Sequence, residues 1–427
     1  MKDLIKKQVA TIQLLWGLSF GFYIFTYGYW LFQSYKNITH SNADAMTFLF
    51  ILMIIRQAGL ILFEVPTGVI TDNLGRSLMI KVAFAFKLIF QLGLFIIIFI
   101  ASKYSIIVVG VILSISFSIA SSSFNGSLSR YVYDHYGEAT DEYKATVAKG
   151  HQRFFIGELL AGLISVILLY YNMQFAPYLF GVVCCCIGLI YAIRILKDAP
   201  QIKKSIKWVE KLKIAKIVFS KLPANATLIL LFGVFMFLLN LIELQWMVHL
   251  FGKEYSQISI SVPILLGLIL CFCIPRLVAS SIARIVIARL QDSIGSARNC
   301  VIATTVLSSI CIFSLGSINY LSGEVNIYFF TLTIIVVVFT HGFSAPLIEI
   351  LQNYYFPKKL FESRATMLSL GSMFRSILVV LFACFLKSDL PEKIPSSWII
   401  PSIVLFIISI ITNFILINQD KKIIFLT

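Results

Sequence analysis

The chain has 427 residues, of which 59% are hydrophobic and only 13% are charged. A soluble domain carries roughly a quarter of its residues as charged types, and a chain of this size with so few polar side chains would not cover a water-exposed surface. This composition excludes soluble enzymes, disordered or fibrous proteins and nucleic-acid-binding proteins, and it indicates an integral membrane protein.

Long apolar stretches recur along the whole chain. The hydrocarbon core of a bilayer is about 30 Å thick, so a spanning helix needs roughly 20 mostly apolar residues. The stretches lack the alternating pattern of an outer-membrane barrel, and a segment in lipid must satisfy its own backbone hydrogen bonds, which leaves helices. The sequence predicts an all-α membrane protein with twelve transmembrane helices, at residues 9–33, 46–71, 79–101, 105–131, 150–171, 175–196, 225–251, 258–284, 299–319, 325–351, 363–387 and 397–418.

The basic residues predict which side of the membrane each loop faces. The formal net charge is +15. With twelve spans both termini lie on one side, and most lysines and arginines between the spans fall on that side. By the positive-inside rule the N- and C-termini are cytoplasmic, and the excess charge requires no nucleic-acid partner. The basic residues of the loops on the opposite side are few, namely Lys36, Lys103, Lys253, Lys387 and Lys393.

A long polar interval divides the chain into two six-helix halves. We expect an N-terminal bundle over 1–197, a cytoplasmic linker over 198–224 and a C-terminal bundle over 225–427. Apolar residues in the linker recur at helical spacing among lysines, which is typical of an amphipathic helix on the anionic inner leaflet of the lipid bilayer. A connector with a charged face explains the same pattern.

Between spans 2 and 3 the chain contains the pattern G-x-x-x-D-x-x-G-R, formed by Gly68, Asp72, Gly75 and Arg76. Gly68 allows two helices to approach closely, and Gly75 permits a tight turn in a very short loop. The Asp72 carboxylate is suited to accept from the N-terminal amides of another helix, and Arg76 is suited to hold a second carboxylate. We therefore expect these residues to hold together the helix ends that meet at this loop.

This pattern closely resembles the inter-helix signature of the major facilitator superfamily of secondary transporters. The resemblance implies two six-helix bundles whose cytoplasmic side is clamped when the central cavity opens outward. It implies that Asp72 caps the start of span 11 near Ser363–Ala365 and that Arg76 reaches Asp134 at the inner end of span 4. Arg364 is expected to stabilise the inner face beside span 11.

Further segments resemble a bacterial subgroup of this superfamily. The second span ends in the sequence Glu-Val-Pro-Thr-Gly at residues 64–68. Residues 126–134 and 364–370 are similar to that subgroup's fourth and eleventh helices. The resemblance implies a multi-pass protein of the bacterial cytoplasmic (inner) membrane that exports drugs or secreted metabolites.

A degraded copy of the signature lies between spans 8 and 9, where a duplicated six-helix unit would place it. Asp292 and Gly295 keep their spacing, whereas Ala288 replaces the first glycine and Ser296 replaces the arginine. We expect the clamp of the second half to be weaker and to depend on Asp292.

Arg56 and Gln57 in span 2 are the first candidates for substrate binding. Arg56 precedes Gly68 by about 18 Å of helix, close to the bilayer midplane. An ionisable group at that depth costs a few kcal/mol and calls for a partner or a function. Arg56 would suit an anionic substrate, with Gln57 adding an amide. The alternative is a structural pair with Glu243 or another buried acid.

Span 7 contains a second candidate group. Glu243 offers a carboxylate beside the amide of Gln245 and the aromatic surface of Trp246. We expect substrate contact or proton coupling here. The alternative is an acid near the outer end of the span, partly in water.

Three more ionisable residues lie at membrane depth. Glu158 in span 5 is a candidate for titration during transport, or it pairs with Arg153. Arg375 in span 11 is either a cavity cation or the partner of an acid.

Aromatic and hydroxyl side chains gather on spans 1 and 4, which line the cavity in this superfamily. Tyr23 and Tyr27 belong to the aromatic set of span 1, and span 4 is rich in serine. An aromatic wall facing a hydroxyl-rich wall would suit an amphipathic organic molecule. Close helix packing and interfacial anchoring explain the same residues.

No motif indicates a cofactor. The eight cysteines have no zinc-type spacing with histidines, and neither a G-x-x-x-x-G-K-[ST] loop nor H-E-x-x-H occurs. The sequence therefore predicts no cofactor, no bound metal and no enzymatic activity.

The leading hypothesis is a monomeric secondary transporter that moves a small organic solute by alternating access. We expect a proton gradient to drive export of an amphipathic compound, with Glu243 and Glu158 as the first titratable residues to test. The alternative is uptake of an anionic metabolite or a siderophore-type metal chelate, favoured by Arg56, Arg276 and Arg375. A non-transporting receptor or a membrane enzyme is the most distant alternative.

Overall fold

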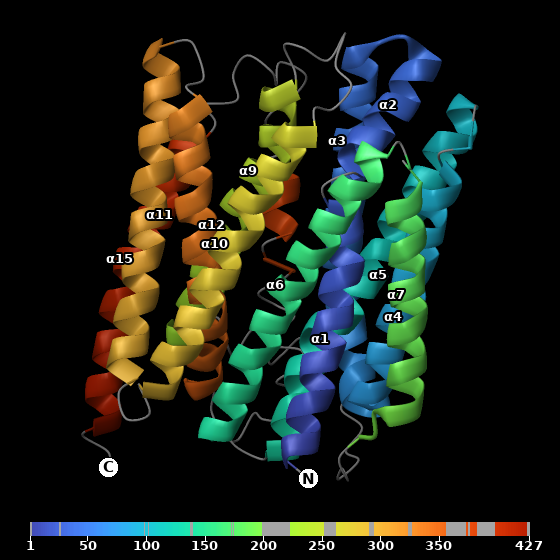
Figure 1. Cartoon of the computed structure of the whole chain (residues 1–427). Coiled ribbons are helices and arrows are strands. Elements are labelled where there is room, and N and C mark those ends of the chain that lie inside the picture. Colours follow the sequence, from blue (N-terminus) through green and yellow to red (C-terminus); the bar gives the residue numbers. More distant parts are fainter. Residues whose placement is uncertain are drawn as a thin grey trace.

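Long helices run side by side from one end of the molecule to the other in a computed structural model of the chain (Figure 1). Helix α1 begins and α15 ends at the same end of the bundle, the lower one in Figure 1. The structure describes residues 2–24, 27–97, 99–100, 102–136, 140–171, 173, 175–198, 223–251, 262–289, 294–322, 327–355, 373–374, 376–381 and 398–424.

The helices follow the expected division of the chain into spans. Those before the linker are α1 (Lys2–Ile24), α2 (Tyr27–Thr39), α3 (Asn42–Leu74), α4 (Arg76–Ile97), α5 (Lys103–Tyr136), α6 (Asp141–Tyr170) and α7 (Ala176–Ile195). Those after it are α9 (Pro223–Phe251), α10 (Val262–Arg289), α11 (Ile294–Ser322), α12 (Ile327–Tyr354) and α15 (Ile399–Ile424).

Within the described residues, nine helices are long and apolar enough to cross a membrane. They coincide with expected spans 2–6, 8–10 and 12. Helix α1 covers much of expected span 1 and α9 covers span 7, although neither meets the same criterion in its described part. Most of expected span 11, at 363–387, lies outside the described residues. The molecule is thus a multi-pass, all-α membrane protein, and the count of twelve remains a prediction.

The chain between spans 1 and 2 differs from expectation. Residues Tyr27–Thr39 form α2, where the pattern placed the end of a span and a loop. Helix α3 then begins at Asn42, because the Ser41 side chain accepts a hydrogen bond from the backbone N–H of Asp44 at 3.2 Å and caps the helix.

Glycines set the spacing between α1 and α6. A Cβ atom on Gly17 would lie 2.1 Å from the carbonyl oxygen of Phe154, and one on Gly157 would lie 2.5 Å from that of Leu14. Only glycine allows the two backbones this approach, which is the usual way that helices pack where no hydrophobic effect drives them together. The inner helices of the N-terminal half are therefore fixed closely against each other.

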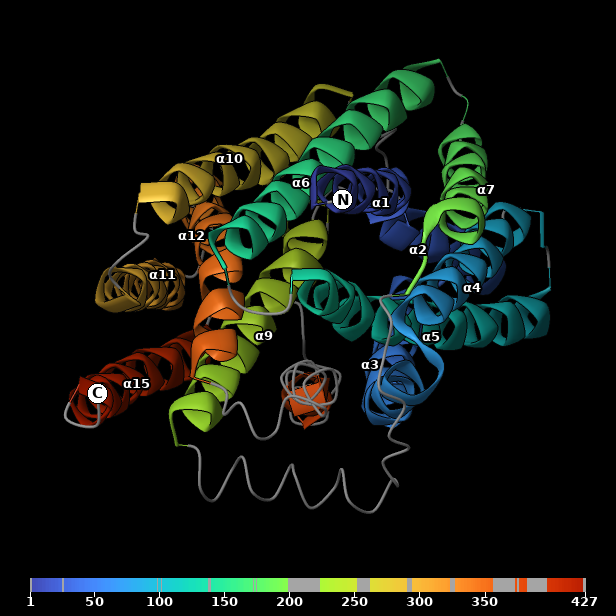
Figure 2. The ribbon, with the colours of Figure 1, turned by 90° about the horizontal axis from the view of Figure 1, so that it is seen from below.

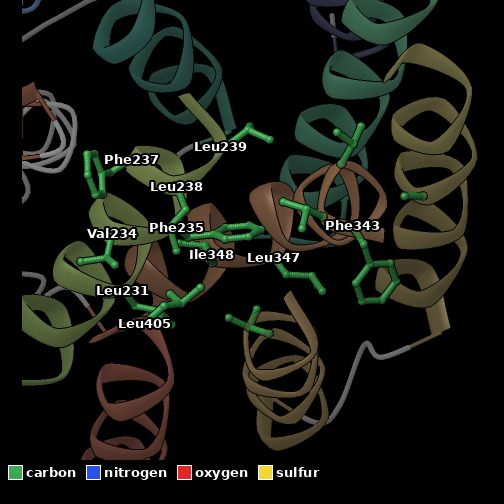
Figure 3. Close-up of a cluster of buried hydrophobic side chains, with 14 of the residues drawn as sticks. Leu231, Val234, Phe235, Phe237, Leu238, Leu239, Phe343, Leu347, Ile348 and Leu405 are labelled. Carbon is green, nitrogen blue, oxygen red and sulfur yellow. The ribbon is translucent and has the colours of Figure 1, made fainter. Parts of the chain in front are cut away.

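A large apolar core fills the C-terminal half. Phe235 of α9 points toward Ile348 of α12 (Figure 3), and Leu231, Val234 and Leu347 belong to the same cluster. All five side chains are buried. Dispersion contacts of this kind hold helices together in lipid, where the apolar surroundings supply no net drive for association.

The two halves meet along α6 and α10. Seen from below, these helices lie side by side, one from each half (Figure 2). The expected amphipathic helix of the linker at 199–222 lies outside the described residues, so the domain boundaries remain a prediction.

Candidate functional site

The turn between α3 and α4 is a single residue. Gly75 has φ 113° and its N–H closes α3 onto the carbonyl of Thr71 at 3.2 Å. A Cβ atom on Gly75 would lie 2.5 Å from an Asp198 carboxylate oxygen. The position thus requires glycine both for its left-handed backbone and for space, as the signature pattern indicated.

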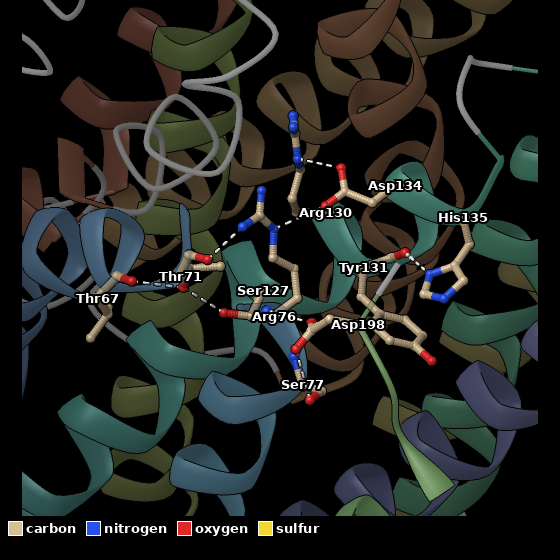
Figure 4. Close-up of polar contacts among 10 residues, drawn as sticks. All are labelled: Thr67, Thr71, Arg76, Ser77, Ser127, Arg130, Tyr131, Asp134, His135 and Asp198. Atoms are coloured by element: carbon tan, nitrogen blue, oxygen red, sulfur yellow. Dashed lines mark hydrogen bonds and ion pairs between the residues drawn. The ribbon is translucent and has the colours of Figure 1, made fainter. Parts of the chain in front are cut away.

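Asp198 caps the first turn of α4. Its carboxylate accepts hydrogen bonds from the backbone N–H groups of Arg76 and Ser77 at 2.7 and 2.8 Å, and from the Ser77 hydroxyl at 3.0 Å (Figure 4). A negative charge at a helix N-terminus is stabilised by the helix dipole. Sequence analysis missed this residue, because it follows α7 and lies far along the chain.

Arg76 is held by groups from both neighbouring helices. Its Nε lies 3.0 Å from Asp134 Oδ2 on α5, and its Nη1 donates to the Thr71 carbonyl at 2.6 Å. Asp134 also pairs with Arg130, whose Nε lies 2.7 Å from Oδ1 (Figure 4). The contact between Arg76 and Asp134 that the resemblance implied is present, and its role in gating remains a prediction.

The other residues of the signature are described less completely. Gly68 is buried inside α3. The Asp72 side chain, Arg364 and the expected cap at Ser363–Ala365 lie outside the described residues.

The second half contains a contact that sequence analysis did not find. Arg298 near the start of α11 pairs with Asp420 near the end of α15, and the Tyr355 hydroxyl donates to Asp420 at 2.6 Å. Burial and the hydrogen bond to Asp420 raise the pKa of Tyr355 above its ordinary value. Gly295 lies in the first turn of α11, whereas Asp292, on which we expected this clamp to depend, lies outside the described residues.

One buried ion pair joins the two halves of the described structure. Arg276 Nη1 on α10 lies 2.9 Å from Glu158 Oε1 on α6, and both side chains are shielded from solvent, with exposed fractions of 5% and 0%. Glu158 therefore pairs across the interface, whereas Arg153, which we considered as an alternative partner, is exposed. Arg276, which we counted in favour of an anionic substrate, is neutralised by this acid.

Polar contacts continue along the same interface toward the cytoplasmic end expected for these helices. Gln152 on α6 donates to the Ser281 hydroxyl at 2.9 Å and accepts from Arg284 at 3.0 Å, both on α10. His151 Nε2 lies 3.2 Å from Glu349 Oε2 on α12. Polar contacts thus join the halves beside apolar packing, because Ala148 and Val166 of α6 belong to the same buried cluster as the core of the C-terminal half.

Among the described side chains, Arg56 lies beside an aromatic ring, and no ion pair joins it to an acid. Its guanidinium carbon is 5.0 Å from the centroid of Phe117 on α5, and its backbone carbonyl accepts from the Ser118 hydroxyl at 2.7 Å. Gln57 is buried with an exposed fraction of 3%. Ser118 and Ser127 of span 4 thus bond to α3, the latter to the Thr71 hydroxyl at 2.8 Å, so these two hydroxyls serve helix packing.

The tyrosines expected to line a cavity belong to an aromatic cluster. Tyr23 is fully buried, and its ring packs edge-on against Tyr27, Phe90 and Phe117. Lys87 of α4 reaches into this cluster, with Nζ 4.2 Å from the centroid of Tyr23. Sequence analysis assigned no function to Lys87.

Four candidates for substrate binding or coupling also lie outside the described side chains, namely Glu243, Gln245, Trp246 and Arg375. Among the residues that the structure does describe, no group of histidine, cysteine and acidic side chains is arranged to hold a metal ion, and seven cysteines are free.

Comparison with known proteins identifies the fold. No family model matches the sequence, and no curated protein matches it. Solved structures do. The human organic anion transporter has a TM-score of 0.66 at 14% identity, covering 96% of this chain and 99% of its own. A D-xylose–proton symporter has a TM-score of 0.67 at 14% identity, covering 95% and 96%. A bacterial homologue of the iron transporter ferroportin, in an outward-facing state, has a TM-score of 0.65 at 13% identity, covering 96% and 99%.

The chain therefore has the fold of the major facilitator superfamily, as the signature at Gly68–Arg76 implied. The three proteins are transporters rather than enzymes, in agreement with the expected class. Their cargoes differ widely, so the likeness defines the architecture and not the solute.

Proposed function

We propose that this protein is a secondary transporter in which the two halves rock around a solute bound between them. The observation that carries the proposal is the contact of Arg76 with Asp134 inside this fold, at the turn where the superfamily places its clamp. The polar contacts along α6 and α10 support it, because rocking requires contacts between the halves that can break and re-form.

Proton coupling is the drive that we propose. Glu158 is the titratable group best placed for it among the described side chains, since it is buried between the halves and paired with Arg276. Protonating this carboxylate would cancel its attraction for the guanidinium and loosen the interface. Glu243 remains the second proposed coupling residue.

Export of an amphipathic organic compound across the bacterial inner membrane is the direction and cargo that we propose. The apolar, ring-rich interior around Tyr23 and Tyr27 supports a cargo with a large apolar part. Uptake of an anionic solute is the second candidate, and a specific observation favours it: no ion pair joins Arg56 to an acid among the described residues.

Flux into proteoliposomes tests the transport function. The purified chain is reconstituted and a pH gradient of either sign is imposed, with radiolabelled 4-phenylbutyrate and the cationic dye ethidium as probes. We expect gradient-dependent movement of at least one probe, with the sign of the effective gradient giving the direction. A chain that moves neither probe under either gradient, while liposomes with a known transporter do, would contradict the proposal.

A further inference from the structure

The ammonium group of Lys87 is enclosed by aromatic rings. Lys87 is fully buried, and its Nζ has no hydrogen-bond acceptor among the described residues. The ring centroids lie 4.2 to 5.4 Å from Nζ. We call these rings the aromatic cage, which consists of Trp16, Phe20, Tyr23, Phe90 and Phe117. Ring faces attract a cation, but they do not neutralise it.

A second cation lies against the same cage. Phe117 has Lys87 Nζ at 4.7 Å and the Arg56 guanidinium carbon at 5.0 Å from its ring centroid. In the described structure neither cation forms an ion pair with a carboxylate. Arg276 shows the contrast, because at membrane depth it is matched by Glu158.

Lys87 is fully buried and Arg56 is partly buried. Two cations on one ring, with no carboxylate beside them in the described structure, repel each other and are costly to withdraw from water. An anion between them would remove both costs. The surroundings also favour one kind of anion. A small, strongly hydrated anion would need several hydrogen-bond donors, whereas the cage supplies mostly apolar ring surface, which suits an anion with an apolar body. The buried amide of Gln57, next to Arg56, adds one polar group.

We propose that Arg56 and Lys87 together bind the acidic group of an amphipathic organic anion, with the aromatic cage holding its apolar body. This inference rests on the proposed transport function and names the class of its solute. Phe117 contacts both cations, so turning this one ring aside gives a single carboxylate access to both. Gln57 then donates a hydrogen bond to the same group.

Binding to the purified full-length chain in an uncharged detergent tests the site without requiring transport. The probes are 4-phenylbutyrate and its neutral amide, which differ in charge but hardly in shape, and binding is measured by equilibrium dialysis. The absence of charged lipid leaves the probe as the sole source of an organic acid. We expect saturable binding of the acid at least about tenfold tighter than that of the amide, which corresponds to one charge-assisted contact.

Variants assign the effect to the two cations. Lys87→Met and Arg56→Met should each weaken binding of the acid about tenfold and leave the amide unchanged, because each removes one charge at similar side-chain length. Lys81→Met, on the same helix but outside the cage, is the matched control and should bind the acid like the wild type. A probe-dependent change in tryptophan emission that disappears in Trp16→Phe would place the probe beside the cage.

A structural role for Lys87 predicts a different result. If the ammonium only stabilised the helices, Lys87→Met would lower the apparent Tm, whereas removing an uncompensated buried charge should leave the Tm unchanged or raise it. Equal affinity for acid and amide, absence of saturable acid binding, or undiminished acid binding by Lys87→Met would each overturn the proposal. Charge-selective binding without flux in proteoliposomes would instead refute the transport function and leave this site standing.

Discussion

Glu158 on α6 and Arg276 on α10 form an ion pair of 2.9 Å that joins the two halves of the molecule out of reach of solvent. Removing one member of such a pair leaves a buried charge without compensation, which costs more than the pair itself contributes. The effect of each charge should therefore depend strongly on the presence of the other.

We expect Glu158→Gln to destabilise the protein by about 3 kcal/mol and to lower its apparent Tm in detergent. The double variant Glu158→Gln with Arg276→Met should recover much of the loss, because no unpaired charge remains. Thermal unfolding of the four proteins in a double-mutant cycle measures this coupling. Independent, additive effects would show that the two residues do not act as a pair.

Gly75→Ala should destabilise the turn between α3 and α4 by about 1–3 kcal/mol. An alanine would have to adopt the positive φ of Gly75, and its methyl group would clash with the Asp198 carboxylate. Gly295→Ala is the matched control, because the nearest atom to its added Cβ lies at 3.9 Å and its backbone is helical. The measurement is the apparent Tm of both variants. An equal loss of Tm at the two positions would contradict a special requirement for glycine at position 75.

Arg76→Lys should reduce transport about tenfold while leaving membrane insertion intact. A lysine carries the charge, but it lacks the planar fork with which Arg76 contacts Asp134 and the Thr71 carbonyl together. Initial flux rates in proteoliposomes provide the measurement. Lys144→Met, which removes an exposed i,i+3 pair with Asp141, should transport normally. Full activity in Arg76→Lys would mean that charge alone suffices at this position.

Tyr355 should make the stability of the wild type sensitive to alkaline pH. Because its pKa is raised in the folded state, the hydroxyl contributes stability that is fully present below the unfolded value of about 10. This stability is lost as the pH rises further, toward the folded-state pKa. Tyr355→Phe should lower the apparent Tm at neutral pH, since the bond to Asp420 is lost. Above about pH 10 the two proteins should converge. A constant difference across this range would exclude Tyr355 as the responsible group.

The sequence predicts local features of this molecule well and distant partners poorly. The length of the apolar stretches locates the spans, and the spacing of Gly75 and Arg76 predicts the tight turn and its basic residue. Which side chain a charged residue contacts depends on how the helices pack. Glu158 contacts Arg276 on another helix rather than nearby Arg153, and nothing local to Asp198 indicates that it caps α4. The enclosure of Lys87 by rings from α1, α4 and α5 is likewise a property of packing alone.

The acids Asp198 and Asp420 occupy matching places in the two halves. Asp198 follows α7, the last helix of the first half, and accepts hydrogen bonds from the beginning of α4. Asp420 lies near the end of α15, the last helix of the second half, and pairs with Arg298 near the beginning of α11. A helix tied in this way cannot bend away from its neighbours without breaking a charged contact. In the rocking motion that we propose, each half should therefore turn as one stiff body instead of bending.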